Sequence, residues 1–422
     1  MRLRRFLEIG AILIAAALLA VMLWRVSTAQ NMTLDTGQPV FGDFIAFWSA
    51  ARATLDGHIE QVHDRALIFS YHQLAAPDVR FVAPWNSPPT FLLMVLPFAL
   101  LPYPAAALLF FALTGALYLY AARKLLPDWR ALIFAITLPA AFFQIGTVQV
   151  GLLIAGLSAL ALHWLDRKPL TAGALVGLLA IKPHLAILWP IFLALSGRWR
   201  AFGAAAVSTL AFVLIAGAAF GFDAYVRFFD NLRASQDLIA GQRITTPAYA
   251  SLYANLLDMS AAPALATALH ALSASAAVLA AAWIFGSAPT FVIPGRPQAE
   301  PGTQGPTKRR LPLGSGSSLH GSRNDEKTAI QGAALCAATL LVSPYLFFYD
   351  FTLLAVGAAL LGAPRDRFEL TAAIFAWSAA LSLTLGYLAP VPLCPLAAWI
   401  VLIAAMRRAR SVAPHRAPAP QP

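Results

Sequence analysis

Four short polar segments of a mostly apolar chain carry side chains that could do chemistry. Asp43 is a carboxylate that can accept a proton, and the cation Arg52 follows it closely. Gln144 to Gln149 form an amide-containing turn, Lys182-Pro183-His184 interrupts an apolar stretch, and Tyr345 to Asp350 end in a second carboxylate. Ionisable groups at membrane depth are costly, so their presence indicates function. We expect the four segments to converge on one site at the non-cytoplasmic side.

Three of these residues also have a purely structural interpretation. Lys182 could extend its ammonium group to the membrane surface or cap the end of a helix. Asp350 could pair with a neighbouring cation without touching a substrate. His184 could be an ordinary structural histidine beside a helix end. The sequence alone leaves these alternatives open.

The composition excludes most classes of soluble protein. Of the 422 residues, 59% are hydrophobic and 12% are charged, whereas soluble domains have about 45–50% apolar and about 25% charged residues. Too few charges remain to cover a water-facing surface, which argues against a soluble enzyme or a nucleic-acid binder. The net charge of +11 instead indicates a membrane protein, because the cytoplasmic loops of such proteins carry an excess of Lys and Arg. The cysteines, Cys336 and Cys394, have no disulfide or zinc spacing.

The N-terminal segment predicts a membrane anchor. Arg2 to Arg5 precede an apolar run from Phe6 to Trp24. This run exceeds the signal-peptide core of about 7–15 residues and approaches the roughly 20 residues that a span requires. We predict a retained first transmembrane helix, and the alternative is a signal peptide that is cleaved near Ser27 to Ala29.

Residues 25–88 are polar and contain no apolar run long enough to span a membrane. Phe44, Phe47 and Ala51 share one face of a helix with Trp48, so we predict an extracytoplasmic loop of short amphipathic helices. Aromatic side chains favour the lipid headgroup level. The candidates for that position are Trp48, Phe81 and Trp85.

The rest of the chain alternates apolar segments with Pro and Gly. Several segments are too short to span, and broken helices are tolerated in a bilayer only where protein or a water-filled cavity satisfies the backbone. We therefore expect a site inside a bundle of about 12 crossings, with 89–101 re-entrant. The apolar segments are 89–101, 104–122, 131–145, 150–165, 169–181, 184–196, 201–220, 261–285, 329–343, 350–363, 370–388 and 392–406.

The distribution of Lys and Arg predicts the orientation. With both termini in the cytoplasm, most basic residues lie on the cytoplasmic side. Residues 286–328 are rich in Pro, Gly and Ser and contain a basic cluster, so we predict a disordered cytoplasmic linker. The expected organisation is a membrane module at 1–285, this linker, and C-terminal transmembrane helices with a basic tail at 329–422.

Several motifs resemble glycosyltransferase family 87. Gly42-Asp43-Phe44, followed by Phe47 to Ala51 and by Leu55-Asp56-Gly57, is similar to the family's first-loop signature. Trp85 to Pro89 is similar to the aromatic-Pro-Pro entry into its second helix. The likeness runs from about residue 8 to 405, apart from the linker.

Three later motifs extend the resemblance. Gly146 to Gln149 occupies the place of a Gly-Gln-x-Asn turn, and Ala172 to Pro183 matches well. Ser343-Pro344-Tyr345 with Tyr349-Asp350 resembles a late helix start. The chain departs from the family at Thr147 and Gln149, where Gln and Asn are frequent, and at His63, where Tyr is frequent. These departures leave the sugar and the acceptor open.

The resemblance implies an all-α polytopic membrane protein of the GT-C fold. It implies transfer of a hexose, for example mannose, from a polyprenyl-phosphate donor to an envelope glycolipid or glycan at the extracytoplasmic face of the cell membrane. Asp43 is then the expected catalytic base, and Lys182 and Arg52 are expected to neutralise the lipid phosphate. The residues expected to bind substrate are Arg52, Trp85, Gln149, Lys182, His184, Tyr345, Tyr349 and Asp350.

Neither a cofactor nor a metal ion is expected. His58, His63 and His72 share the first loop with Asp64, but their spacing fits no ligand pattern. The expected partners are the lipid donor, the acceptor and membrane lipids, with no nucleic acid. The main alternative is a transporter or flippase of lipid-linked sugars, which also needs broken helices and charges at membrane depth. A second alternative is a non-catalytic partner in an envelope assembly.

Overall fold

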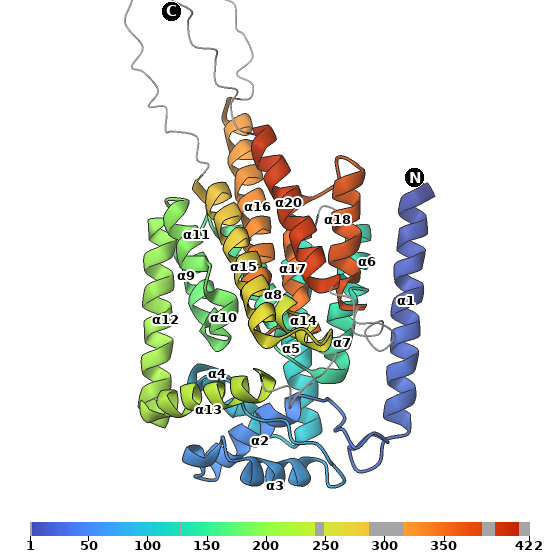
Figure 1. Ribbon diagram of the computed structural model, residues 1–422, viewed down its shortest axis with the longest axis vertical. Helices are drawn as coiled ribbons and strands as arrows, with labels where there is room; N and C mark the ends of the chain where they lie inside the picture. The colour runs from blue at the N-terminus through green and yellow to red at the C-terminus, as the bar shows by residue number, and fades with distance from the viewer. Residues whose placement is uncertain (1, 127–128, 241–248, 287–315, 382–392, 413–422) are drawn as a thin grey trace, which may run out of the picture.

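The computed structural model describes residues 2–126, 129–240, 249–286, 316–381 and 393–412. Within these ranges the chain forms helices and no strand (Figure 1). Among the described residues, four helices are long and apolar enough to cross a membrane. They are α1 (Arg2–Ser27), α5 (Tyr103–Leu125), α12 (Trp199–Phe220) and α15 (Pro263–Gly286). Two further long helices, α16 (Gly316–Val342) and α20 (Leu393–Val412), lie beside α15.

Shorter helices fill the bundle between the long ones. Helix α8, at 14 residues, is about 21 Å long, less than the roughly 30 Å of a bilayer core. The expected 12 crossings therefore stay a prediction. The short apolar elements are α4 (Pro89–Val95) with η2 (Leu96–Leu100), α6 (Trp129–Ile136), α7 (Pro139–Thr147), α8 (Gly151–Trp164), α9 (Pro169–Leu178) with η3 (Leu179–Ile181), α10 (Pro183–Ala186), α11 (Trp189–Leu195), η4 (Phe348–Phe351) with α17 (Thr352–Leu361), and α18 (Arg367–Ser378) with η5 (Ala379–Leu381).

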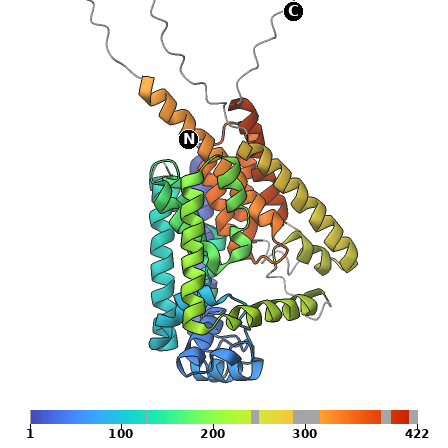
Figure 2. The same cartoon turned by 90° about the vertical axis from the view of Figure 1, so that its left-hand side faces the viewer.

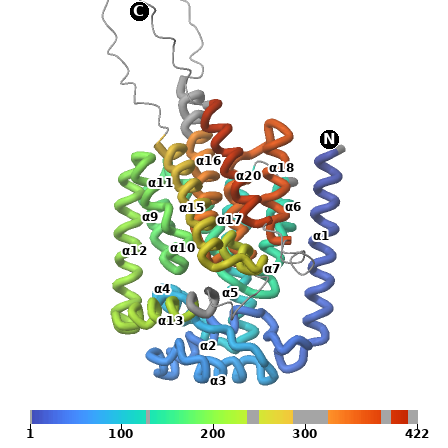
Figure 3. The backbone as a smooth tube through the Cα atoms, in the orientation of Figure 1, coloured from blue at the N-terminus to red at the C-terminus, as the bar shows by residue number. Residues whose placement is uncertain are grey.

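The first loop is a small helical unit at one end of the molecule, opposite the N-terminus (Figures 1 and 3). It contains α2 (Phe44–Leu55), η1 (Ile59–Gln61) and α3 (Arg65–Ala75). We call the end of the molecule that carries these three elements the loop end. Helix α13 (Asp223–Ala240) lies across the same end, nearly perpendicular to α12 (Figure 2). The short α14 (Leu252–Asp258) precedes α15.

Residues 44–51 are helical as predicted, but the helix that contains them is not amphipathic. Helix α2 is buried on nearly all sides, because it packs between α3, α4, η2 and α5. The Trp48 indole is 6% exposed and donates a hydrogen bond to the Leu101 carbonyl at 2.9 Å, and Trp85 is 2% exposed. Neither tryptophan can therefore lie among lipid headgroups, whereas Phe81 is exposed.

An aromatic cluster attaches the loop unit to the helices behind it. Phe47 meets Phe91 edge-on, with ring centroids 4.7 Å apart, and Trp85 stacks on Phe91 at 5.7 Å. On the other side, Phe44 contacts Phe110 of α5 at 5.4 Å. Aromatic pairs of this kind contribute about 0.5–1.5 kcal/mol each beyond the burial of their area. The cluster fixes where the N-terminus of α2 lies relative to the bundle.

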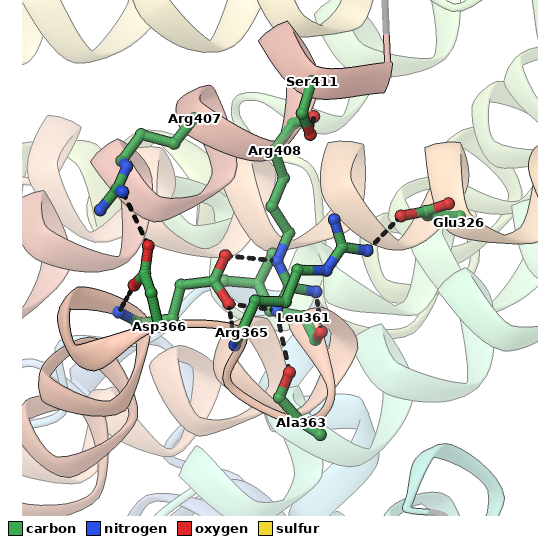
Figure 4. Close-up of polar contacts among 9 residues, drawn as sticks. Glu326, Leu361, Ala363, Arg365, Asp366, Arg407, Arg408 and Ser411 are labelled. Atoms are coloured by element: carbon green, nitrogen blue, oxygen red, sulfur yellow. Dashed lines mark hydrogen bonds and ion pairs between the residues drawn. The ribbon is translucent and has the colours of Figure 1, made fainter.

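The opposite end, which carries the N-terminus, is held by arginines. Arg408 of α20 donates to both carboxylate oxygens of Glu369, at 2.8 and 2.6 Å, and to the carbonyls of Leu361 and Ala363 (Figure 4). Both side chains of the pair are less than a tenth exposed. Burial of both charges makes this pair sensitive to the loss of either partner.

The last part of the predicted linker, from residue 316 onward, is helical. Helix α16 begins at Gly316, before the apolar run. Its first polar turns are anchored by contacts that the local sequence does not reveal: Glu326 pairs with Arg365, and Thr328 accepts a hydrogen bond from Arg198. Residues 286–315 include only one described residue, Gly286, so the remainder of that prediction lies outside the described chain.

The Arg408→Ala substitution should destabilise the fold strongly. It leaves the Glu369 carboxylate buried without its cation, which costs about 3–5 kcal/mol of unfolding free energy. Arg407 pairs with Asp366 beside it, but both side chains are more than two-fifths exposed. Arg407→Ala should therefore cost less than about 1 kcal/mol. Denaturant unfolding of both variants in detergent measures the difference, and equal losses would contradict it.

Candidate active site

Asp43 stands at the N-terminus of α2, in front of its first turn. Its Oδ2 accepts a hydrogen bond from Nε2 of Gln149 at 3.0 Å. The preceding residue, Gly42, has φ of +42°, and a Cβ there would lie 2.9 Å from the Gly146 carbonyl oxygen. Only glycine combines this conformation with such a close approach at low cost. Gly42 therefore lets the first loop touch the 146–149 turn and brings Asp43 to Gln149.

The turn between α7 and α8 positions Gln149. Helix α7 ends at Val148 in the left-handed conformation, with φ of +47°. Gln144 then accepts a hydrogen bond from the Leu152 backbone N–H at 3.0 Å, which satisfies an orphan donor of the α8 N-terminus. A Cβ on Gly151 would lie 2.4 Å from the Tyr349 carbonyl oxygen, so α8 begins directly against η4.

Lys182 reaches the same region from the break between η3 and α10. Pro183 cannot donate a backbone hydrogen bond, so the helix stops and restarts at Lys182. The Lys182 Nζ donates to Asp350 Oδ1 at 2.5 Å and lies 4.9 Å from the centre of the Tyr349 ring. The Asp350 side chain has no exposed surface, whereas that of Lys182 is 14% exposed.

Electrostatic interactions join the two groups of residues. Burial raises the pKa of the Asp43 carboxyl above its ordinary value, although the Gln149 hydrogen bond and the positive charge of Lys182 both lower it. A buried carboxyl with a raised pKa, next to a specific cation, is a candidate for proton transfer. Three tyrosines also interact electrostatically with Asp43: they are Tyr103, Tyr249 and Tyr349.

The structure thus brings together five of the nine residues predicted for the site. They are Asp43, Gln149, Lys182, Tyr349 and Asp350. His184 lies near Lys182, which acts on it electrostatically. Its Nε2 is buried and has no hydrogen-bond partner among the described residues.

The other three predicted residues lie elsewhere. Arg52 is in the last turn of α2, away from Asp43, and pairs with Asp56 at 3.1 Å. Trp85 belongs to the aromatic cluster, and its carbonyl accepts hydrogen bonds from His63 and Asn231. The Tyr345 ring packs against Tyr253, in a separate small cluster. About two and a half turns of helix separate Arg52 from Asp43, so the structure does not bring Arg52 together with Asp43.

Sequence reasoning missed Tyr103 and Tyr249. Tyr103 follows Leu101-Pro102 at the start of α5, and its hydroxyl donates to the Val40 carbonyl in the loop. The sequence feature that could have pointed to Tyr103 is its position directly after Pro102. Tyr249 forms an isolated bridge with Phe347, and their rings lie 4.7 Å apart. No sequence pattern linked these two positions, which are far apart in the chain.

The described residues contain no group of three or more His, Cys, Asp or Glu side chains that could hold a metal ion. His72 of the first loop is instead a structural residue, since its Nδ1 lies 2.8 Å from Ser49 Oγ and its Nε2 faces the Ala83 backbone. Burial lowers the pKa of His72 to about 4. Its imidazole is therefore neutral at physiological pH.

The helices and the carboxylate–lysine site define an all-helical membrane protein with a polar site among broken helices. A family model of glycosyltransferase family 87 matches residues 85–293, and this match places that part of the chain in the family and indicates a membrane glycosyltransferase. No curated protein and no solved structure matches the chain. Gln149, Lys182 and His184 lie inside the matched range, whereas Asp43 and Asp350 flank it.

The Gly42→Ala substitution should separate Asp43 from Gln149. The new methyl group would collide with the Gly146 carbonyl, so we expect glycosyl transfer to fall at least tenfold. Gly57→Ala is the matched control, because Gly57 also has positive φ but open space around its Cβ position. It should cost about 1 kcal/mol of stability and leave transfer intact. Activity and melting temperature of both variants test this, and similar activities would contradict it.

Proposed function

We propose that the protein transfers a hexose, for example mannose, from a polyprenyl-phosphate donor to a hydroxyl group of an envelope glycolipid or glycan. Transfer takes place at the loop end, on the extracytoplasmic face of the cell membrane, and both termini lie in the cytoplasm. The observation that carries the proposal is that Asp43, which accepts a hydrogen bond from Gln149, lies within electrostatic range of Lys182, which Asp350 binds at the break of a helix. No cofactor is needed, since the donor brings its own leaving group.

The proposed reaction is a displacement at the anomeric carbon. The acceptor hydroxyl gives its proton to the Asp43 carboxylate while its oxygen forms a bond to the anomeric carbon. The bond between that carbon and the phosphate oxygen breaks from the opposite side, so the configuration inverts. The departing polyprenyl phosphate gains negative charge, which the Lys182 ammonium stabilises. Such placed charge is often the largest single contribution to catalysis.

Two features of Asp43 support its role as the base. Burial raises its pKa, which brings the carboxyl closer to the operating pH at which a general base works best. The hydrogen bond from Gln149 occupies one carboxylate oxygen, Oδ2, and fixes the orientation of the group. The other oxygen, Oδ1, is then the one proposed to receive the proton.

An apolar stripe beside Lys182 supports a lipid-linked donor. Ile187, directly after α10, and Ile191 and Leu195 of α11 are exposed at intervals of four residues. Helix α11 packs between the candidate spans α12 and α15, so the stripe lies on a lipid-accessible side of the bundle. A donor whose phosphate binds Lys182 could lay its isoprenoid chain along this stripe.

The Asp43→Asn substitution should lower kcat by about 10²-fold or more, because the amide cannot take the proton. Asp78→Asn is the control in the same loop, since Asp78 is exposed and its carboxylate accepts a hydrogen bond from the exposed Asn31. The assay measures formation of the glycosidic bond from synthetic polyprenyl-phosphate mannose. Full turnover by the Asp43 variant would remove it from the mechanism. Transport of the lipid-linked sugar across vesicles without bond formation would favour the flippase alternative.

The double substitution Ile187→Gln and Ile191→Gln should raise KM for a long-chain donor several-fold. A donor with two isoprene units should be unaffected, because its chain is too short to follow the stripe. Leu108→Gln, at an exposed position of α5, is the control for a general effect of surface polarity. An equal rise in KM for both donors would show that the stripe does not contact the chain.

A further inference from the structure

Asp350 is sealed inside the protein, and both of its carboxylate oxygens are occupied. Oδ1 accepts from Lys182 Nζ, and Oδ2 accepts from the Phe347 backbone N–H at 3.1 Å. The second bond closes the turn η4 and fixes the carboxylate to the backbone. Since its side chain has no exposed surface, Asp350 cannot reach a substrate without rearrangement of this turn.

Lys182 is held on two sides but keeps one side accessible. Asp350 binds its ammonium group, and the Tyr349 ring lies 4.9 Å away. A lysine side chain has four rotatable bonds, so without such contacts its charge would occupy many positions. The remaining exposed surface of Lys182 is therefore the part of this pair that can meet an anion.

The turn η4 also touches the part of the site that holds Asp43. Thr352 Oγ1 lies 2.9 Å from the carbonyl oxygens of both Gly151 and Tyr349. Gly151 begins α8, two residues after Gln149, which binds Asp43. Asp350 thus belongs to a rigid connection between the base and the cation.

We infer that Asp350 is a positioning residue that holds the Lys182 ammonium group where it meets the phosphate of a polyprenyl phosphate, without touching that lipid itself. This inference rests on the proposed function for the identity of the lipid. It assigns Asp350 a role different from the direct substrate contact that the sequence suggests. Asp350 then acts on the ligand only through Lys182.

A double-mutant cycle tests this dependence. The proteins are the wild type, Asp350→Asn, Lys182→Met and the double variant, all full-length in detergent, and the probe is polyprenyl phosphate without a sugar. We expect each single substitution to weaken binding at least tenfold. The double variant should bind as Lys182→Met does, because Asp350 has nothing left to position. Asp350→Glu should recover part of the affinity.

The pH profile of transfer gives a second readout that a merely structural role would not move. Asp350→Asn removes a negative charge and frees Lys182 to interact more strongly with Asp43, so the acidic limb should move to lower pH. Lys182→Met removes a positive charge and should move it to higher pH. The groups around Asp43 that remain unchanged in both variants are Gln149, Tyr103, Tyr249 and Tyr349.

Asp166→Asn is the control, because Asp166, in the turn after α8, pairs with Arg198, directly before α12, and among the described residues neither contacts the site. It should leave the affinity for polyprenyl phosphate unchanged. Multiplicative effects in the double variant, an unchanged affinity in Asp350→Asn, or equal binding of polyprenol and polyprenyl phosphate would each overturn the inference. If the double-mutant cycle gives the expected affinities but the wild-type protein transfers no sugar, the proposed function is overturned and the inference about Asp350 stands.

Discussion

The burial of charge in an apolar bundle is the constraint on which the rest of this structure depends. An isolated ammonium or carboxylate in such surroundings is strongly disfavoured, so each must meet a partner with good geometry. Lys182 and Asp350 meet this requirement although 168 positions separate them in the chain. The helix break before Pro183 and the turn η4 place these two groups beside each other.

Close backbone contacts make the pairing possible. Gly42 abuts the 146–149 turn, and Gly151 abuts the carbonyl of Tyr349. Both glycines allow separations that a Cβ would forbid, so the first loop, α8 and η4 converge within a small volume. The helices that start there are short because their N-termini lie within the bundle rather than at its surface. Short helices that begin beside the polar site thus take the place of helices that would be continuous across the bundle.

The two ends of the molecule are held together by different interactions. At the loop end, aromatic side chains hold the helices together, and the buried Trp48 and Trp85 attach the unit that carries Asp43 to the bundle. At the opposite end, arginines such as Arg198 and Arg408 tie helix termini together through carboxylates. Rigid attachment at both ends fits a site whose groups must be held to within fractions of an ångström.

The amino-acid sequence was sufficient to predict the class of protein, its apolar segments and several residues of the candidate site. Low charge and long apolar runs exclude a soluble fold, and an ionisable group inside such a run is informative wherever it occurs. Lys182 and Asp350 could be predicted in this way without coordinates, whereas Asp43 lies in the polar first loop and was predicted as the base from the resemblance to glycosyltransferase family 87.

Which of these residues contact one another could be learned only from the tertiary structure. Arg52 sits close to Asp43 in the chain but faces Asp56, whereas Asp350 is distant in the chain and binds Lys182. It also decided that Trp85 is part of the core and that α16 begins at Gly316. The reason is physical: local patterns report the preferences of neighbouring residues, whereas burial and pairing depend on contacts between segments far apart in the chain.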